Sequence, residues 1–362
     1  MLRLSTLSFA LLASSSTLLA DFGWDVSGGI VAIHQGTQTA NIKPQNSASM
    51  DFILDRPLAR GDVVVHFEGA TTPKDGSVAT YIPESNSDSG TALDQDNEGR
   101  FQLSQLYYTY TFESESTLSV GLVDITSFFE QSRIASDEAT QFLGTFFTSN
   151  PTIDFPDYTL GAIYEQTIYS DIVLRSAIAS AKGLADNNTR SYSQLLSLND
   201  NEDGIFAIAS ATYNYENFYI RAGIWTNTAD HSSVTGSAEE LDNYGLYSIT
   251  GYQYGDHSLN LRIGHARESV NRGSDFVALN YQYLHGAYLF GMGAGEVFLS
   301  PKQLDKTLGN TRQYELYMRY EPVEKIYITF DFQSVYNSDF GELAQLRNKY
   351  INLYGVRLSY LF

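Results

Sequence analysis

The stretch YINLYGVRLSYLF, residues 350–362, ends the sequence and gives its clearest structural signal. Tyr354, Val356 and Leu358 occupy one parity of this stretch, whereas Arg357 and Ser359 occupy the other. Because successive side chains of a strand point to opposite faces, the pattern predicts a β-strand with one apolar face and one polar face.

The same period of two recurs along the chain, for example at 257–267, where Leu259, Leu261 and Ile263 alternate with polar residues or Gly. An apolar outward face and a polar inward face are typical of strands in a membrane barrel. The whole sequence divides into sixteen expected strands, at 23–33, 49–58, 62–70, 100–112, 115–124, 158–166, 169–180, 204–215, 217–226, 243–254, 257–267, 274–284, 286–296, 312–321, 324–335 and 350–362.

The connections between these strands alternate between short and long, as the turns and external loops of bacterial barrels do. The long ones are expected at 34–48, 71–99, 125–157, 181–203, 227–242, 268–273, 297–311 and 336–349. A soluble β-sandwich or propeller would also have period-two strands, but it predicts neither this alternation nor an apolar parity on strand after strand. We therefore predict an all-β fold, a transmembrane antiparallel β-barrel of about 16 strands.

The beginning of the chain and its composition fit an exported protein. An Arg, an apolar run and small residues up to Ala20 predict a signal peptide at 1–20, leaving the barrel at 21–362. Twenty-six Tyr and 21 Phe suit barrel strands and their aromatic girdles, and a net charge of −20 argues against nucleic acid as a partner. The six His are scattered, and no grouping of Ser, His and acid is visible, so we expect neither an enzyme nor a cofactor.

The connection at 125–157 is the third external loop of this arrangement. A short helix is expected at about 136–148, with Ser136 as N-cap and acidic residues in its first turn. The Phe-rich loop should fold inward to narrow the wide channel of a sixteen-stranded barrel; the alternative is a helix covering the mouth. The constriction residues expected in and beside this loop are Asp124, Phe128, Phe129, Glu130, Arg133, Asp137 and Glu138.

The inward parity of the strands predicts a charged pore wall. Arg175, Arg221, Arg262 and Arg357 fall near mid-strand, with Arg319 lower down, and suggest a basic arc facing acidic residues of the loop. Opposed charges in a narrow lumen with low-dielectric walls focus an electric field that orients polar solutes. The other expected pore-lining residues are Glu68, Glu315, Asp331, Tyr107, Tyr219, Tyr317 and Tyr327, although inward Arg and Tyr are also what any water-filled lumen tolerates.

Several motifs together resemble one protein family. QLSQLYY at 102–108, GLVD at 121–124, FFE at 128–130 and QFL at 141–143 are similar to the carbohydrate-selective porin (OprB-like) family. This resemblance implies a passive diffusion channel for small sugars in the bacterial outer membrane, in contact with lipid and lipopolysaccharide. It also implies recognition of the terminal Phe362 by the barrel-assembly machinery, and we include a homotrimer among the expected partners.

The chain departs from the family pattern at Val123, where the family often has Lys before the aspartate equivalent to Asp124. It is also short for the family, and we expect trimmed external loops. Both departures affect sugar selectivity more than pore formation. A general or cation-preferring porin is therefore the alternative, and the acidity of the chain supports it.

Overall fold

The structure is a computed structural model that describes residues 23–88, 92–186, 189–196 and 203–362. These residues form one closed antiparallel barrel in which each strand pairs with its neighbours in sequence. Its strands are β1 Asp25–Thr37, β2 Gln45–Leu58, β3 Gly61–Ala70, β4 Phe101–Thr111, β5 Thr117–Val123, β6 Thr159–Tyr169, β7 Ile172–Ser180, β8 Ile205–Tyr215, β9 Phe218–Ser232, β10 Glu240–Tyr254, β11 His257–Ala266, β12 Gly273–His285, β13 Tyr288–Leu299, β14 Thr311–Val323, β15 Ile326–Tyr336 and β16 Tyr350–Leu361.

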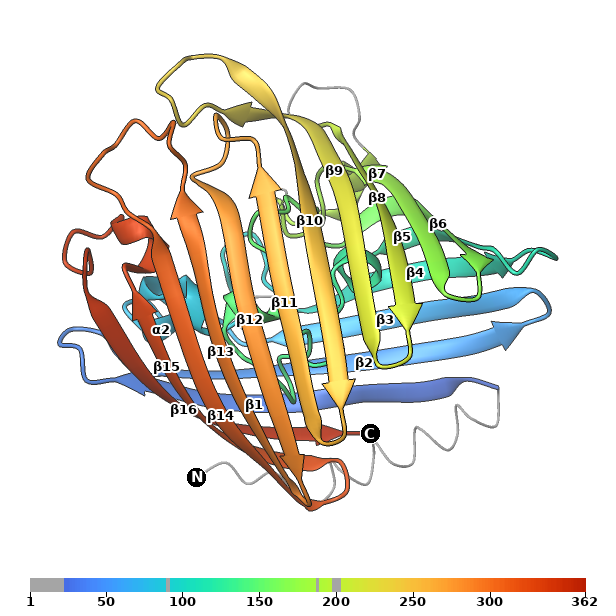
Figure 1. Cartoon of the computed structure of the whole chain (residues 1–362), viewed down its shortest axis with the longest axis horizontal. Coiled ribbons are helices and arrows are strands. Elements are labelled where there is room, and N and C mark those ends of the chain that lie inside the picture. The colour runs from blue at the N-terminus through green and yellow to red at the C-terminus, as the bar shows by residue number, and fades with distance from the viewer. Residues whose placement is uncertain (1–22, 89–91, 187–188, 197–202) are drawn as a thin grey trace.

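The first and last strands close the barrel. β1 pairs with β16 in a register that places Ile33 opposite Arg357, and the backbone N–H of Phe362 donates to the Gly28 carbonyl at 3.0 Å. Figure 1 shows β1, in blue, beside the red C-terminal strands. Closure leaves no strand edge unpaired, which is the condition for a sheet to cross a bilayer.

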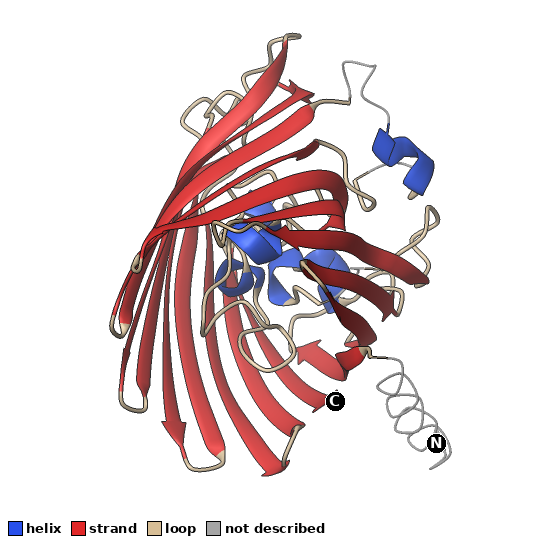
Figure 2. Cartoon of the chain, turned by 90° about the vertical axis from the view of Figure 1, so that its right-hand side faces the viewer, coloured by secondary structure: helices blue, strands red, loops and turns tan. Residues whose placement is uncertain are grey.

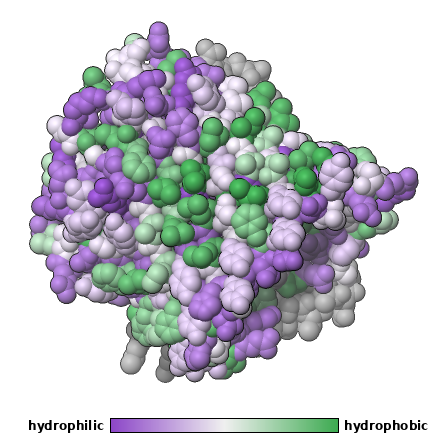
Figure 3. Space-filling model, viewed as in Figure 1, coloured by the Kyte–Doolittle hydropathy of each residue, from purple (hydrophilic) through white to green (hydrophobic). Residues whose placement is uncertain are grey.

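The two faces of the wall differ as the sequence predicts. In β16, Tyr354, Val356 and Leu358 are exposed on the outside, and the residues between them, including Arg357, are buried inside. Apolar side chains gather across the middle of the face shown in Figure 3, between more hydrophilic regions. The expected sixteen strands and the inward and outward parities are confirmed, with differences of a few residues at strand ends.

Three inward tyrosines each cover a glycine on the adjacent strand. Tyr219 pairs with Gly251, Tyr247 with Gly223, and Tyr317 with Gly291. A Cβ added to Gly251 would lie 2.0 Å from the Tyr219 ring, and the other two pairs are similarly tight. Glycine therefore lets each ring lie flat against the wall, as in the aromatic rescue of glycine in sheets.

The helical segments are short and belong to the connections. They are α2 Val78–Tyr81, η1 Pro83–Ser85, α3 Thr126–Phe129, α4 Thr145–Thr148, η2 Tyr192–Leu196 and η3 Ser338–Gly341. Within the described residues, no helix is long and apolar enough to span a membrane. Figure 2 shows several of these segments inside the ring of strands.

The expected helix at 136–148 is wrong in extent, because only its last turn, α4, is helical. Asp137, rather than Ser136, caps a single turn through the N–H of Ala139 at 2.9 Å. The backbone of Gly144 is extended (φ −69°, ψ 135°), which separates that turn from α4. The expected signal peptide at 1–20 lies outside the described residues.

Replacing Gly251 with Val should displace the Tyr219 ring and destabilise the barrel by about 1–3 kcal/mol, the usual cost of overpacking. Urea unfolding in lipid vesicles, followed by the gel shift of the folded barrel, measures the change. Ala222→Val, on the exposed outer face of β9, adds bulk without meeting a ring and serves as the control. Equal stability of the two variants would contradict the packing role of the Tyr–Gly pairs.

Candidate pore constriction

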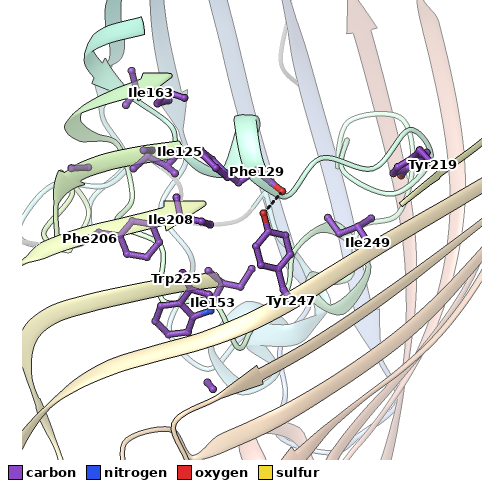
Figure 4. Close-up of a cluster of buried hydrophobic side chains, with 14 residues drawn as sticks. Ile125, Phe129, Ile153, Ile163, Phe206, Ile208, Tyr219, Trp225, Tyr247 and Ile249 are labelled. Carbon is purple, nitrogen blue, oxygen red and sulfur yellow. Dashed lines mark hydrogen bonds between the residues drawn. The ribbon is translucent and has the colours of Figure 1, made fainter. Parts of the chain in front are cut away.

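The third loop, residues 124–158, lies inside the barrel and packs on its wall. Phe129 is fully buried among inward side chains of β7 to β10, including Phe206 and Trp225. The Tyr247 hydroxyl donates to the Phe129 carbonyl at 3.0 Å, as the dashed line in Figure 4 shows. Farther along, Phe142 lies edge-on to Tyr317, with 5.0 Å between ring centroids. Apolar anchors thus hold both halves of the loop against the wall.

Arg262 on β11 is the most heavily bonded side chain in this contact. Its Nε donates to Glu130 Oε1 at 2.6 Å, and both side chains are fully buried. The same guanidinium donates to Ser136 Oγ at 2.7 Å and to the carbonyls of Phe147 and Thr148. One arginine therefore joins three separate parts of the loop.

The other predicted arginines also donate to loop carbonyls, each from a different strand. Arg221 on β9 binds the Phe129 carbonyl at 2.9 Å, and Arg319 on β14 binds the Thr140 carbonyl at 2.9 Å. Arg357 on β16, which is 2% exposed, donates to the carbonyls of Glu138 and Gln141. Arg175 on β7 donates to the Phe128 carbonyl and pairs with Glu165 on β6.

Glu315 on β14 satisfies the opposite kind of backbone group. Its two carboxylate oxygens accept the N–H groups of Leu143 and Gly144, at 2.8 and 2.7 Å. Asp331, on the neighbouring strand β15, accepts from the Gln333 side chain at 3.0 Å. Glu315, a predicted pore-lining acid, thus holds the backbone where α4 begins.

A second loop also enters the barrel with its described residues 78–88, which the sequence did not predict. Gln313 donates to the Glu84 carbonyl at 2.6 Å, and Gln333 donates to the Ser85 carbonyl at 2.9 Å. The Ser87 N–H then donates to the Leu143 carbonyl at 2.9 Å, so that the two loops touch. Inward Gln residues on neighbouring strands were the only sequence signal for this contact.

The space left open lies on the side of β1 to β4. A cavity of about 720 Å³ extends between these strands and the third loop. Six carboxylates line it, together with His66, and no Lys or Arg does so among the described residues. The acids are Asp51, Glu68, Asp124, Asp137, Glu138 and Asp157.

Burial changes the proton affinity of the loop acids. It raises the pKa of Glu138 to about 8, and the nearby Asp88 adds to this rise. Burial also raises the pKa of Asp88 to about 6 and that of Glu130 to about 7, although Arg262 opposes the shift at Glu130. Of these three acids, Glu138 borders the cavity, so the charge of the cavity changes as pH passes through about 8.

The structure differs from the expected basic arc that faces acidic residues across an open lumen. The arginines do lie on the inward face, but their guanidinium groups bind the loop and do not border the cavity. The reason is that the loop brings bare carbonyl groups to that wall, and buried carbonyls need donors. The accessible wall is acidic instead.

The remaining predicted residues mostly take part in packing around the loop. Tyr107 lies edge-on to Phe128, Tyr219 lies under Arg133, and Tyr327 lies under Arg319. Glu68 borders the cavity and accepts from the Tyr158 hydroxyl. Asp124 caps α3 through the N–H groups of Thr126 and Ser127, at 2.9 and 3.2 Å.

Sequence reasoning did not select Asp51, Asp88, Tyr158 or Tyr247 as site residues. Asp51 has inward parity on β2, directly opposite Glu68, and this pairing was the available signal. Asp88 belongs to the second loop, which was not expected inside the barrel. Tyr247 also covers a glycine, but its contact with the third loop has no local sequence signal and depends on the fold.

Replacing Arg262 with Met should free the third loop, because it leaves Glu130 and two carbonyls without their donor. Removing one partner of a buried ion pair costs about 3–5 kcal/mol. Limited proteolysis of the barrel in vesicles should then cut between 130 and 150, where the wild type resists. Arg312→Met removes a partly exposed pair with Glu296 and should leave the resistance intact. If both variants resist equally, Arg262 does not hold the loop.

Comparison with known proteins finds relatives by structure alone, since no family model and no curated protein matches the chain. The high-pH structure of Pseudomonas putida OprB superposes with a TM-score of 0.74 at 11% identity, covering 97% of each chain. A loop-deletion mutant of OmpT from Vibrio cholerae gives 0.58 at 12% identity, covering 94% of this chain and 99% of that one. A mutant of the Rh. blastica porin gives 0.56 at 11% identity, covering 94% and 100%. The likeness to an OprB barrel that the motifs suggested is confirmed at the level of the fold: this chain has the sixteen-stranded barrel of the outer-membrane porins.

Proposed function

We propose that this protein is a passive diffusion channel of the bacterial outer membrane for small hydrophilic solutes. The observation that carries the proposal is the cavity of about 720 Å³ between β1 to β4 and the inserted third loop. The inserted loop narrows a barrel that is otherwise wide enough for an aqueous channel. The apolar outer face suits lipid and lipopolysaccharide, and Phe362 suits recognition by the assembly machinery.

The charge of the cavity favours cations and neutral molecules over anions. Six carboxylates border it without a bordering Lys or Arg in the part of the chain described. Like charges on low-dielectric walls create a potential that concentrates ions of opposite sign and repels those of the same sign. The cation-preferring alternative from the sequence therefore gains support from the geometry.

Small sugars are the neutral solutes that we propose. Carboxylates and the Gln105 amide offer acceptors and donors to sugar hydroxyls, and Tyr158 adds an aromatic ring at the same cavity. The resemblance of the sequence motifs to carbohydrate-selective porins points to the same class of solute. The structural likeness to OprB, at 11% identity, supports the barrel fold and not the choice of sugars as the solute.

The reversal potential of single channels in a KCl gradient should show a preference for K⁺ over Cl⁻. The preference should weaken as pH falls through about 8, because Glu138, with its raised pKa, gains a proton there. Glu138→Gln should have the lower preference above about pH 8, should match the wild type well below that pH, and should lose that part of the pH dependence. Arg312→Gln, remote from the cavity, is the control; an anion-preferring wild type would contradict the proposed charge filter.

Liposome swelling should be faster with glucose than with an anionic solute of similar size, such as gluconate. The physical reason is that the acidic cavity repels gluconate but not glucose. An amino acid of matched size and no net charge tests whether sugars have an advantage beyond neutrality. If the swelling rate depends on solute size alone, sugar selectivity is contradicted, and the proposal of a general diffusion channel remains.

A further inference from the structure

His66 connects the cavity wall to the beginning of the third loop through two polar contacts. Its Nε2 lies 3.0 Å from Asp51 Oδ1, and its Nδ1 lies 2.9 Å from Gln105 Nε2. The Oε1 atom of the same Gln105 amide accepts the backbone N–H of Asp124 at 3.2 Å. A continuous chain of hydrogen bonds thus runs from β2 through His66 and Gln105 to the loop.

The donors and acceptors in this chain fix the protonation of His66. The backbone N–H of Asp124 is only a donor, so Gln105 must turn its oxygen toward Asp124 and its NH₂ group toward His66. The Nδ1 atom of His66 must then accept a hydrogen bond. These contacts suit a neutral imidazole with its proton on Nε2, donated to Asp51.

A protonated His66 cannot satisfy the same contacts. Its Nδ1–H would face the NH₂ group of Gln105, which is a contact between two donors. Rotating the amide would satisfy His66 but would turn the NH₂ group toward the Asp124 N–H. We propose that His66 and Gln105 form a pH-sensitive latch, in which protonation of His66 releases the beginning of the third loop.

The groups around His66 on the cavity side are acidic. The charged or titratable groups that face it are Asp51 on β2, Glu68 on its own strand β3, and Asp124 and Tyr158 from the third loop. All of these groups are acids or a phenol, and the bordering residues of this cavity that the structure describes include no Lys or Arg. Protons entering the cavity therefore meet a net negative potential at His66.

A metal ion fits the group of Asp51, His66 and Glu68 less well than a proton does. A histidine that binds metal through Nε2 normally donates its Nδ1–H to an acceptor. Here Nδ1 faces the NH₂ group of Gln105, whose orientation the Asp124 N–H determines. The contacts around His66 thus favour proton exchange over metal binding.

Release at Asp124 would reach the loop segment that borders the cavity through Thr126 and Gln131. The Asp124 carboxylate caps α3, whose last residues Phe128 and Phe129 give their carbonyls to Arg175 and Arg221. A change at the first residue of the loop therefore acts on the segment that Arg175 and Arg221 hold. The effect on conduction rests on the proposed channel function, but the movement of the loop does not.

Hydrogen–deuterium exchange of the barrel in lipid vesicles tests the latch without relying on conduction. After correction for the intrinsic effect of pH on exchange, the 124–130 segment should lose about fivefold protection at pH values where His66 is charged, since one hydrogen bond is lost. His66→Gln should abolish this change. Gln105→Glu should also abolish it, because a carboxylate accepts from both His66 and the Asp124 N–H.

His231→Gln separates the latch from the other histidine beside the loop, since His231 Nε2 lies 2.7 Å from Asp154 Oδ2. This variant should keep the pH response of the 124–130 segment. The latch is overturned if protection in the wild type is independent of pH, if His66→Gln keeps the response, or if His231→Gln removes it. Conductance of the same samples in KCl tests the channel function separately.

Discussion

The pairing of a loop backbone with side chains of the barrel wall is the interaction on which the rest of this structure depends. A chain segment inside a barrel is removed from bulk water, and a buried peptide group without a partner costs about 1–3 kcal/mol. Arginines on five different strands donate to loop carbonyls, while Glu315 accepts two loop N–H groups. Charged partners make these hydrogen bonds stronger than neutral ones.

This pairing also decides which charges a solute meets. On the side of β7 to β16, the guanidinium groups donate hydrogen bonds to the loop. The cavity that remains borders β1 to β4. Acids on β2, β3 and the loop line this cavity, and no Lys or Arg of the described residues lines it with them. The position of the loop therefore divides the interior into a compact, charge-compensated half and an open, acidic half.

Tyrosines over glycines provide the surface on which the loop rests. Tyr247 and Tyr317 lie flat against the wall because Gly223 and Gly291 have no side chain in the way. Each ring then contacts the loop, Tyr247 through the Phe129 carbonyl and Tyr317 through the Phe142 ring. The wall and the loop are thus fitted to each other by residue size as well as by charge.

The sequence by itself determined the sixteen strands, their inward and outward faces, the closing strand ending at Phe362, and the inward course of the third loop. Period-two alternation is local, so each strand reveals its faces without knowledge of its neighbours. The inward parity of Arg262 and Glu315 could be predicted for the same reason. The extent of the loop helix could not be predicted in this way. The extended backbone of Gly144 and the turn capped by Asp137 interrupt the helical pattern.

Only the tertiary structure decided what those inward residues contact. Arg262 and Glu130 are 132 positions apart, and the second loop meets Gln313 across 229 positions. No local sequence pattern predicts contacts between residues so far apart in the chain, because these contacts depend on the path of two loops through a closed barrel. Whether an inward arginine borders water or binds a carbonyl is therefore a property of the folded interior, and this is what made the accessible lumen acidic.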